Sequence, residues 1–225
     1  VEHPRLGIDI AVKPGLFATK VSDGSILFPY DTKESESMAF GMDIDAQYNL
    51  APGTGIRQLF FLIGGHISLP SVEFDETYYD SPQPFIWGFH GGFFKRMYLS
   101  SQHSLTFEAI GGLRYFSIST TVTDGFTDET YILSNNTGGG QISLGYDYAT
   151  SANINFGFTA GMKFYGKSDI WTATDSDGND YPFDHPVYPF PEIDLSGVTF
   201  GIYLHYSPPS LAFDPIDMVR GMMGS

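Results

Sequence analysis

The sequence contains no cysteine, so it has neither a disulfide framework nor thiolate chemistry, and cysteine usage does not reveal its redox compartment. It also lacks any uninterrupted apolar run of about 18 residues, which excludes a transmembrane helix but leaves short, alternating membrane strands open. Basic residues are scarce, with 11 Lys and Arg against 26 Asp and Glu. Because a phosphate backbone needs a basic face, nucleic acid is not an expected partner.

The chain is rich in residues that favour strands and tight turns. Its 225 residues include 20 Phe, 14 Tyr and 26 Gly, and 42% of them are hydrophobic. This length and composition predict a single all-β domain. The start, Val1-Glu2-His3-Pro4, lacks a basic and then apolar leader, so we expect a mature chain whose signal peptide has been removed.

Apolar and polar residues alternate with period two in eight segments, which predicts eight strands with two different faces. The clearest segment runs from Met38 to Leu50, where every second residue is apolar. The others lie near 5–19, 56–69, 85–99, 105–115, 142–148, 154–164 and 198–206.

The predicted connections alternate between short and long. The short ones are 51–55, 100–104 and 150–153, and the long ones are about 20–37, 70–84, 120–140 and 166–196. Outer-membrane barrels have short periplasmic turns and long surface loops, whereas a water-soluble barrel, the alternative, has no reason to separate the two kinds. The pattern predicts an all-β, eight-stranded, antiparallel up-and-down transmembrane β-barrel.

The polar face of these strands predicts a lumen filled with paired charges. In a lipid-embedded barrel this face must point inward, and an eight-stranded barrel is just wide enough for side chains to fill it. Acids and bases are nearly balanced, so they can pair and close the lumen. The predicted network comprises Asp9, Lys13, Asp43, Asp45, His66, His90, Arg96, Glu108, Arg114, Asp147, Lys163 and His205.

The last strand, residues 199–206, resembles the terminal-strand assembly signal of outer-membrane proteins, with Gly201, Leu204 and Tyr206 at the pattern positions. The arrangement up to residue 206 resembles the small OmpA/OmpX-like outer-membrane barrel families. That resemblance implies a bacterial outer-membrane location, contact with the assembly machinery, and a role as adhesin, anchor, structural protein or subunit of a larger machine. The signal usually ends the chain, so we expect residues 1–206 to form the barrel with four long surface loops and 207–225 a periplasmic C-terminal tail.

The predicted loops carry the whole net charge of −15. Exposed acids keep loops soluble, and they can also bind lipopolysaccharide through divalent cations or recruit a basic partner. In the fourth loop, Asp175, Asp177 and Asp180 resemble part of a calcium loop, although its glycine falls too early and an Asp-Gly turn is the alternative. No cofactor is expected.

These features favour a non-enzymatic structural, anchor or interaction protein that binds lipids and protein partners through its acidic, aromatic loops or its tail. Two alternatives stay open: an outer-membrane lipid-modifying enzyme of the lipid A acylase or deacylase type, and a narrow small-solute channel. His103 and Ser104 are adjacent, but no acidic residue is near them in sequence to complete a catalytic set.

Overall fold

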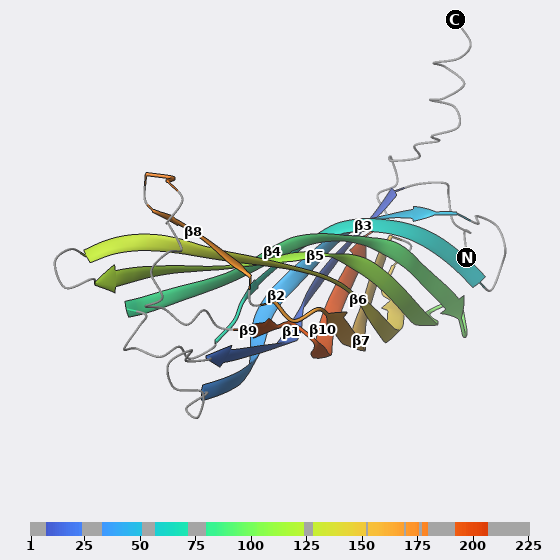
Figure 1. The fold of residues 1–225 in the computed structure, drawn as a ribbon. Coiled ribbons are helices and arrows are strands. Elements are labelled where there is room, and N and C mark those ends of the chain that lie inside the picture. Colours follow the sequence, from blue (N-terminus) through green and yellow to red (C-terminus); the bar gives the residue numbers. More distant parts are fainter. Residues whose placement is uncertain are drawn as a thin grey trace, which may run out of the picture.

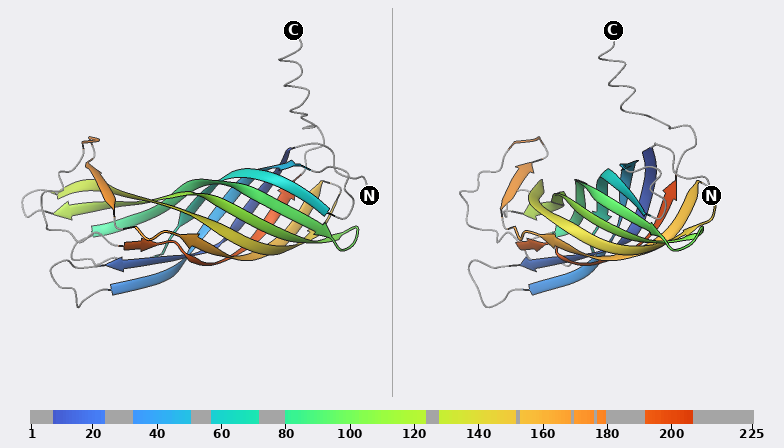
Figure 2. Two further views of the ribbon diagram at one scale, coloured as in Figure 1. Left: turned by 45° about the vertical axis from the view of Figure 1, so that its right-hand side comes forward. Right: turned by 90° about the vertical axis from the view of Figure 1, so that its right-hand side faces the viewer.

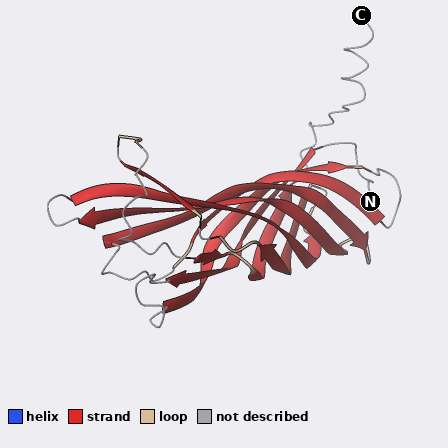
Figure 3. Cartoon of the chain, viewed as in Figure 1, coloured by secondary structure: helices blue, strands red, loops and turns tan. Residues whose placement is uncertain are grey.

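The structure, a computed structural model, describes residues 8–23, 33–50, 57–71, 80–123, 128–151, 153–168, 170–175, 177–179 and 192–206. All regular secondary structure in this part of the chain is β-strand (Figure 3). None of it is a helix long and apolar enough to cross a membrane.

Eight strands form a closed antiparallel barrel (Figures 1 and 2). Strands β1 to β6 each pair with the next strand in the chain, β7 pairs with β10, and β10 pairs with β1 to close the wall. The predicted eight-stranded meander is therefore confirmed. The strands are β1 (Ile8–Asp23), β2 (Lys33–Asn49), β3 (Arg57–Leu69), β4 (Asp80–Tyr98), β5 (His103–Thr123), β6 (Asp128–Ala149), β7 (Ile154–Tyr165), β8 (Trp171–Asp175), β9 (Glu192–Asp194) and β10 (Gly197–Tyr206).

The period-two pattern separates the two faces of the wall, as predicted. Side chains at alternate positions of a strand point to opposite faces, so the apolar set of each strand shares one side. On β7, Phe158 and Phe164 are 60% and 53% exposed, whereas Lys163, which lies on the opposite face of the strand, is only 6% exposed. The apolar face is therefore the outside of the barrel and the polar face lines its interior.

The two ends of the barrel differ in how their strands are joined. At one end, here called the turn end, β4 and β5 are joined through residues 99–102, and β6 and β7 through 150–153. Backbone hydrogen bonds close these turns, including Leu99 N–H to His103 O at 2.8 Å and Thr150 N–H to Ile154 O at 3.0 Å. The opposite end, the loop end, carries the predicted long connections.

Two of the predicted long loops contain much more strand than expected. β5 and β6 remain paired out to Thr123 and Asp128, so most of residues 120–140 is strand, and the prediction of a loop there is wrong. The alternation of polarity that marks the other strands is lost here, because the buried inward positions of β6 include polar Asn135 and Thr137 beside apolar Leu133, while apolar Ile132 faces outward. The segment 166–196 contributes β8, which pairs with β6, and β9, which pairs with β1.

β8 and β9 continue the barrel wall beyond β7 and β10. β9 pairs with β1 up to Asp194, and β10 resumes pairing with β1 at Thr199, so extra residues bulge between them. Gly197 lies at this bulge with φ of 129°, a conformation that side-chain-bearing residues rarely adopt. A second bulge lies between β7 and β8, because β7 ends its pairing with β6 at Tyr165 and Gly139, whereas β8 begins its pairing at Trp171 and Asn135.

Inward-facing glycines let neighbouring strands of the narrow barrel approach closely. A Cβ atom at Gly112 would lie 2.1 Å from the Phe89 carbonyl oxygen, whereas one at the outward-facing Gly111 would meet nothing closer than 3.6 Å. The two adjacent glycines are chemically alike but face opposite sides of the wall. Only Gly112 is required by the packing.

We expect Gly112→Ala to lower the free energy of unfolding by about 1–3 kcal/mol, because the added methyl overpacks the lumen wall. Gly111→Ala should stay within about 0.5 kcal/mol of the original protein, since its methyl adds only ordinary contacts. Denaturant titration of the barrel in detergent micelles, followed by heat-modifiable migration in gels, measures both. Equal effects of the two substitutions would contradict this assignment of faces.

Candidate functional site

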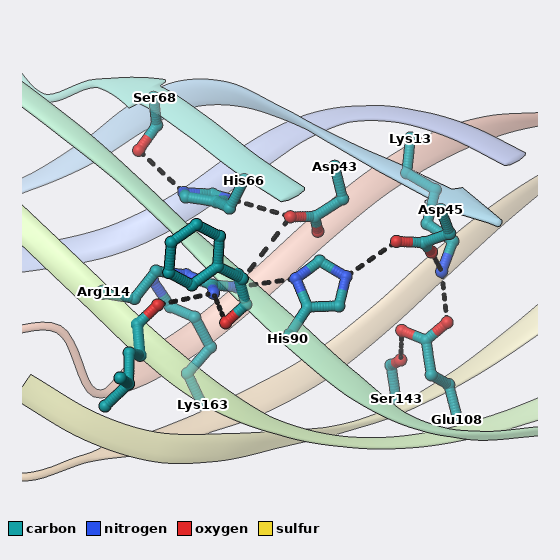
Figure 4. A network of polar contacts seen from close by, with 12 residues as sticks. Lys13, Asp43, Asp45, His66, Ser68, His90, Glu108, Arg114, Ser143 and Lys163 are labelled. Carbon is teal, nitrogen blue, oxygen red and sulfur yellow. Dashed lines mark hydrogen bonds and ion pairs between the residues drawn. The ribbon is translucent and has the colours of Figure 1, made fainter. Parts of the chain in front are cut away.

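The lumen of the barrel is the principal concentration of polar side chains in the described structure. All twelve residues that the sequence places in the lumen network lie on inward faces; eleven are buried and Asp9 is partly exposed. They come from β1 to β7 and β10, so the network crosses the barrel from wall to wall (Figure 4). The structure arranges them in three groups along the barrel axis.

The central group is built around Lys13. Its ammonium lies 2.6 Å from an oxygen of Asp45 and also pairs with Glu108 across the lumen. The other oxygen of Asp45 contacts His90 Nε2 at 2.7 Å, and the Ser143 hydroxyl donates to Glu108 at 3.4 Å. One cation thus holds two buried carboxylates together.

The loop-end group links a histidine to a carboxylate and a hydroxyl. His66 contacts Asp43 through Nδ1 at 2.7 Å and Ser68 through Nε2 at 2.9 Å. Arg114 lies 3.9 Å from Asp43 and 3.4 Å from His90, which joins this group to the central one.

Lys163 completes the charged lining at this level without a direct carboxylate contact within the described residues. It donates to the Ala18 carbonyl oxygen at 2.9 Å, and its ammonium lies 5.4 Å from the centre of the Phe17 ring. The aromatic face and the carbonyl together stabilise the cation.

The turn-end group is centred on Arg96. Its guanidinium donates to Asp147 at 3.1 Å and lies 3.4 Å from His205, which in turn is 3.3 Å from Asp9. The same guanidinium lies 5.6 Å from the Phe60 ring centre and 5.2 Å from that of Phe94. Arg96 is thereby held by charge, hydrogen bonds and aromatic faces at once.

The wall supplies the space that this network needs. A Cβ atom at Gly64 would lie 2.1 Å from Asp45 Oδ1 and 2.7 Å from His90 Nε2. The contact between Asp45 and His90 therefore depends on the missing side chain at position 64. The alternation of the sequence predicted the network's members, but not this dependence.

An apolar cluster that the sequence did not predict closes the lumen above the loop-end group. On β5 the inward positions beyond Arg114 change from polar to apolar, with Phe116 1% and Ile118 0% exposed. The change from polar to apolar residues at every second position of this strand is the signal that could have revealed the cluster. This apolar cap consists of Ile86, Phe116, Ile118, Leu133, Tyr165, Trp171, Ala173, Ile193 and Leu195.

Asp177 and Gly178 belong to the Asp-Gly turn that the sequence offered as the alternative to a calcium loop, and the Gly178 amide donates to the Asp175 carbonyl oxygen at 3.1 Å. One oxygen of Asp175 accepts hydrogen bonds from the Asp177 and Asn179 amides at 2.9 and 2.8 Å, and the other accepts one from the Asn179 side chain. The bonds from Asn179 hold the pKa of Asp175 below its ordinary value. Asp180 lies outside the described residues, and no group of three potential metal ligands occurs in the described part.

The remaining predicted residues lie where the strand pattern places them. Leu204 and Tyr206 face outward on β10, 45% and 41% exposed, and Gly201 pairs with Gly15 of β1. Their role as an assembly signal stays a prediction. His103 and Ser104 begin β5 and face opposite ways: His103 Nδ1 contacts the Tyr146 hydroxyl, and Ser104 is buried in the lumen.

Comparison with known proteins identifies the fold. No protein-family model matches the sequence, and no curated protein matches it. Among solved structures, the outer-membrane protease OmpT of Escherichia coli aligns over 92% of this chain and 99% of its own, with TM-score 0.53 and 8% identity. A major outer-membrane protein of Thermus thermophilus covers 88% and 99% (TM-score 0.48, 14% identity), and Neisserial surface protein A covers 90% and 97% (TM-score 0.43, 11% identity).

At this level of identity the likeness to OmpT shows the fold alone. Together with the closed antiparallel wall, it confirms the predicted resemblance to outer-membrane β-barrels at the level of architecture.

We expect Lys13→Met to lower the free energy of unfolding by about 3–5 kcal/mol, because it leaves Asp45 and Glu108 buried without their shared cation. The matched control is Lys167→Met, which removes a solvent-exposed partner of Glu192 at 2.8 Å and should cause no measurable loss. Denaturant titration in micelles gives both values. A Lys13→Met barrel as stable as the original would show that the central group does not depend on this cation.

Proposed function

We propose that this outer-membrane-type β-barrel is an integral protein of a bacterial outer membrane, where it acts as a closed scaffold that presents its loop end to lipopolysaccharide and protein partners. In this orientation the turn end faces the periplasm and the loop end faces the outside, as in other barrels of this type. The observation that carries the proposal is that the strands continue well beyond a membrane-sized apolar belt while the lumen beneath them is filled.

The apolar belt supports insertion in lipid. Water-soluble proteins rarely expose such a large continuous apolar surface, and a barrel satisfies all its backbone hydrogen bonds within the wall. The exposed side chains come from every barrel strand and include Leu16, Phe40, Ile63, Phe89, Phe107, Leu144, Phe158 and Phe200.

Aromatic residues set the limits of this belt. The outward face of β5 is apolar from Leu105 to Tyr115 and changes to hydroxyl residues at Ser117 and Ser119. About 11 residues lie in the apolar part, which is the length that a tilted strand needs to cross the hydrocarbon. Tyr115 stacks on Trp87 with ring centres 4.3 Å apart, as expected of an interfacial aromatic girdle.

The filled lumen argues for a scaffold over a channel. A solute would have to cross the turn-end group, the central group, the loop-end group and then the apolar cap. Two members of the cap, Ile118 and Ile193, are each 0% exposed. A conducting pore needs a continuous wet path, and this stacking of charged and apolar layers opposes one.

The loop end offers a firm surface for partners. β5 and β6 are 21 and 22 residues long, about twice what the membrane requires, so roughly half of this hairpin projects beyond the belt. β8 pairs along its projecting edge. A surface of hydrogen-bonded strands loses less conformational entropy on binding than a surface of loose loops.

The tail, 207–225, lies outside the described residues and stays a second proposed contact segment.

Because the chain has no cysteine, single cysteines test the orientation and the belt directly. We expect Ser119→Cys to react with a membrane-impermeant maleimide on intact cells, and Leu113→Cys, on the same face of β5, to be protected by lipid. Gln102→Cys, in the turn at the opposite end, should react only after the outer membrane is permeabilised. Labelling of the Gln102 variant but not the Ser119 variant on intact cells would reverse the proposed orientation.

The scaffold role predicts specific contacts at the loop end. A photo-crosslinking amino acid at Asn136, which is exposed on β6 opposite Tyr115 at the loop-end limit of the belt, should yield crosslinks to lipopolysaccharide or protein in native outer membranes. The same group at Phe158 in the belt should yield crosslinks to phospholipid. If Asn136 captures nothing, and the purified barrel shows steady conductance in planar bilayers, the small-solute channel becomes the better explanation.

A further inference from the structure

We propose that Ser68, His66 and Asp43 form a hydrolytic site in which Ser68 is acylated by the carboxylic ester of a lipid. The three side chains are connected in the order that nucleophilic catalysis requires: hydroxyl, imidazole, carboxylate. This activity goes beyond the scaffold role and does not depend on it.

The hydrogen bonds assign a role to each atom. The Asp43 carboxylate can only accept, so His66 Nδ1 carries the proton in the 2.7 Å contact between them. Nε2 of the neutral ring is then the acceptor for the Ser68 hydroxyl at 2.9 Å. His66 is therefore placed to take the serine proton, and Asp43 is placed to orient the ring and to stabilise its protonated form.

Comparison with the other two lumen histidines sets His66 apart. His90 and His205 also face a carboxylate through Nε2, at 2.7 Å from Asp45 and 3.3 Å from Asp9. Their Nδ1 atoms, however, face the guanidinium groups of Arg114 and Arg96, each at 3.4 Å.

A guanidinium keeps its protons, so Arg114 and Arg96 cannot serve as nucleophiles. Each of these two rings therefore faces an arginine where His66 faces a hydroxyl. Among the three lumen histidines, His66 alone has a serine at its second nitrogen.

The sheet register fixes the arrangement. Asp43 and His66 are direct cross-strand neighbours on β2 and β3, and Ser68 follows His66 on the same face. Gly41 lies opposite Ser68, where a Cβ atom would come within 2.4 Å of the serine Cβ. Phe17 packs edge-on against the His66 ring with centres 4.7 Å apart, which restrains the imidazole. The three relay residues are only 2–4% exposed, so their interactions are little screened by water.

The barrel wall changes just above Ser68, on the side of the loop end. Pairing between β2 and β3 stops at Phe40 and Leu69, and pairing between β3 and β4 stops at Ser68 and Ile86. β2 and β4 both continue outward, while β3 ends before Pro70, which has no amide hydrogen to donate. Within the described residues, no strand fills the sheet between β2 and β4 above this point.

The borders of this interruption are apolar on both sides of the wall. Outward-facing Met38, Phe40, Leu69 and Phe85 are between 37% and 64% exposed, and inward-facing Ile86 belongs to the apolar cap. An ester that approaches Ser68 from this side would contact apolar side chains along most of its length, with its reactive carbonyl at the serine. An acyl ester of a membrane lipid fits this description.

The chemistry is an acyl transfer in two halves. Ser68 Oγ bonds to the ester carbonyl carbon as its proton passes to His66 Nε2, and the alcohol leaves with that proton as the ester C–O bond breaks. Water then attacks the acyl-serine, gives a proton to His66, and releases the carboxylic acid while Ser68 recovers its hydrogen. One ester and one water thus give one acid and one alcohol.

An alkyl fluorophosphonate carrying a fluorophore tests the nucleophile in the full-length folded barrel. We expect it to label the protein at Ser68, identified by peptide mass, in micelles and in native outer membranes. Ser68→Ala should abolish labelling and His66→Gln should slow it by about 10²-fold or more, which is the usual contribution of a general base. Ser143→Ala, another lumen serine with a carboxylate contact but no histidine contact in the described structure, is the matched control and should label normally.

A second measurement identifies the substrate class and guards against misfolded variants. Each variant is first checked for heat-modifiable migration. Hydrolysis of p-nitrophenyl esters with 2, 8 and 12 acyl carbons is then measured in micelles at ~10 μM protein. At this protein concentration, a turnover on the order of 1 s⁻¹, which is ordinary for enzymes, is readily detected. Ser68-dependent turnover that increases with chain length supports a lipid ester, whereas a preference for the shortest ester keeps the relay but overturns the lipid assignment. If the folded barrel neither labels nor exceeds Ser68→Ala in hydrolysis, the relay is structural and the proposal is wrong, and the labelling experiments on orientation are unaffected.

Discussion

The need to pair every backbone amide and carbonyl inside lipid governs this molecule. An open sheet would expose an unpaired edge to hydrocarbon, so the eight strands close on themselves through β10 and β1. Closure with so few strands makes a narrow interior, and the period-two alternation then sends most polar side chains of the wall into it. The interior charges have little room for water and must satisfy one another. The ion-paired lumen is thus a consequence of the wall.

The sequence predicted the part of the structure that follows from this alternation. The strands, their inward and outward faces and the twelve lumen residues could be predicted because the outward positions are apolar almost throughout the belt, whereas these twelve polar residues fall at the opposite positions of the alternation. The hairpin beyond Tyr115 could not, because outside lipid the outer face no longer has to be apolar, and the inner face there mixes apolar Phe116 and Ile118 with polar Asn135. Short polar strands and loops then look alike in the sequence. Residues 120–140 were misread for this reason.

The site shows the same limit. Alternation identifies which residues share the lumen, but it does not say which of them touch, because contacts across the barrel depend on register and stagger. His66 and Ser68 are two residues apart on one face, which sequence could have noted. Their carboxylate lies on another strand, and only the pairing of Asp43 with His66 brings it there. His103 and Ser104 are adjacent in the sequence, but adjacency puts two strand residues on opposite faces of the wall.

The bulges beside Gly197 and between β7 and β8 divide the molecule into two regions of different mechanical character. Within the membrane, the wall is an unbroken ladder whose local opening would expose polar groups to hydrocarbon and is therefore strongly opposed. Beyond the bulges, the projecting sheet is bordered by water, where a broken hydrogen bond is readily replaced. Fluctuations that begin at the tip can therefore stop at the bulges without reaching the seal. Such a barrel can vary its outer surface over generations, by insertion or substitution, while its membrane wall stays unchanged.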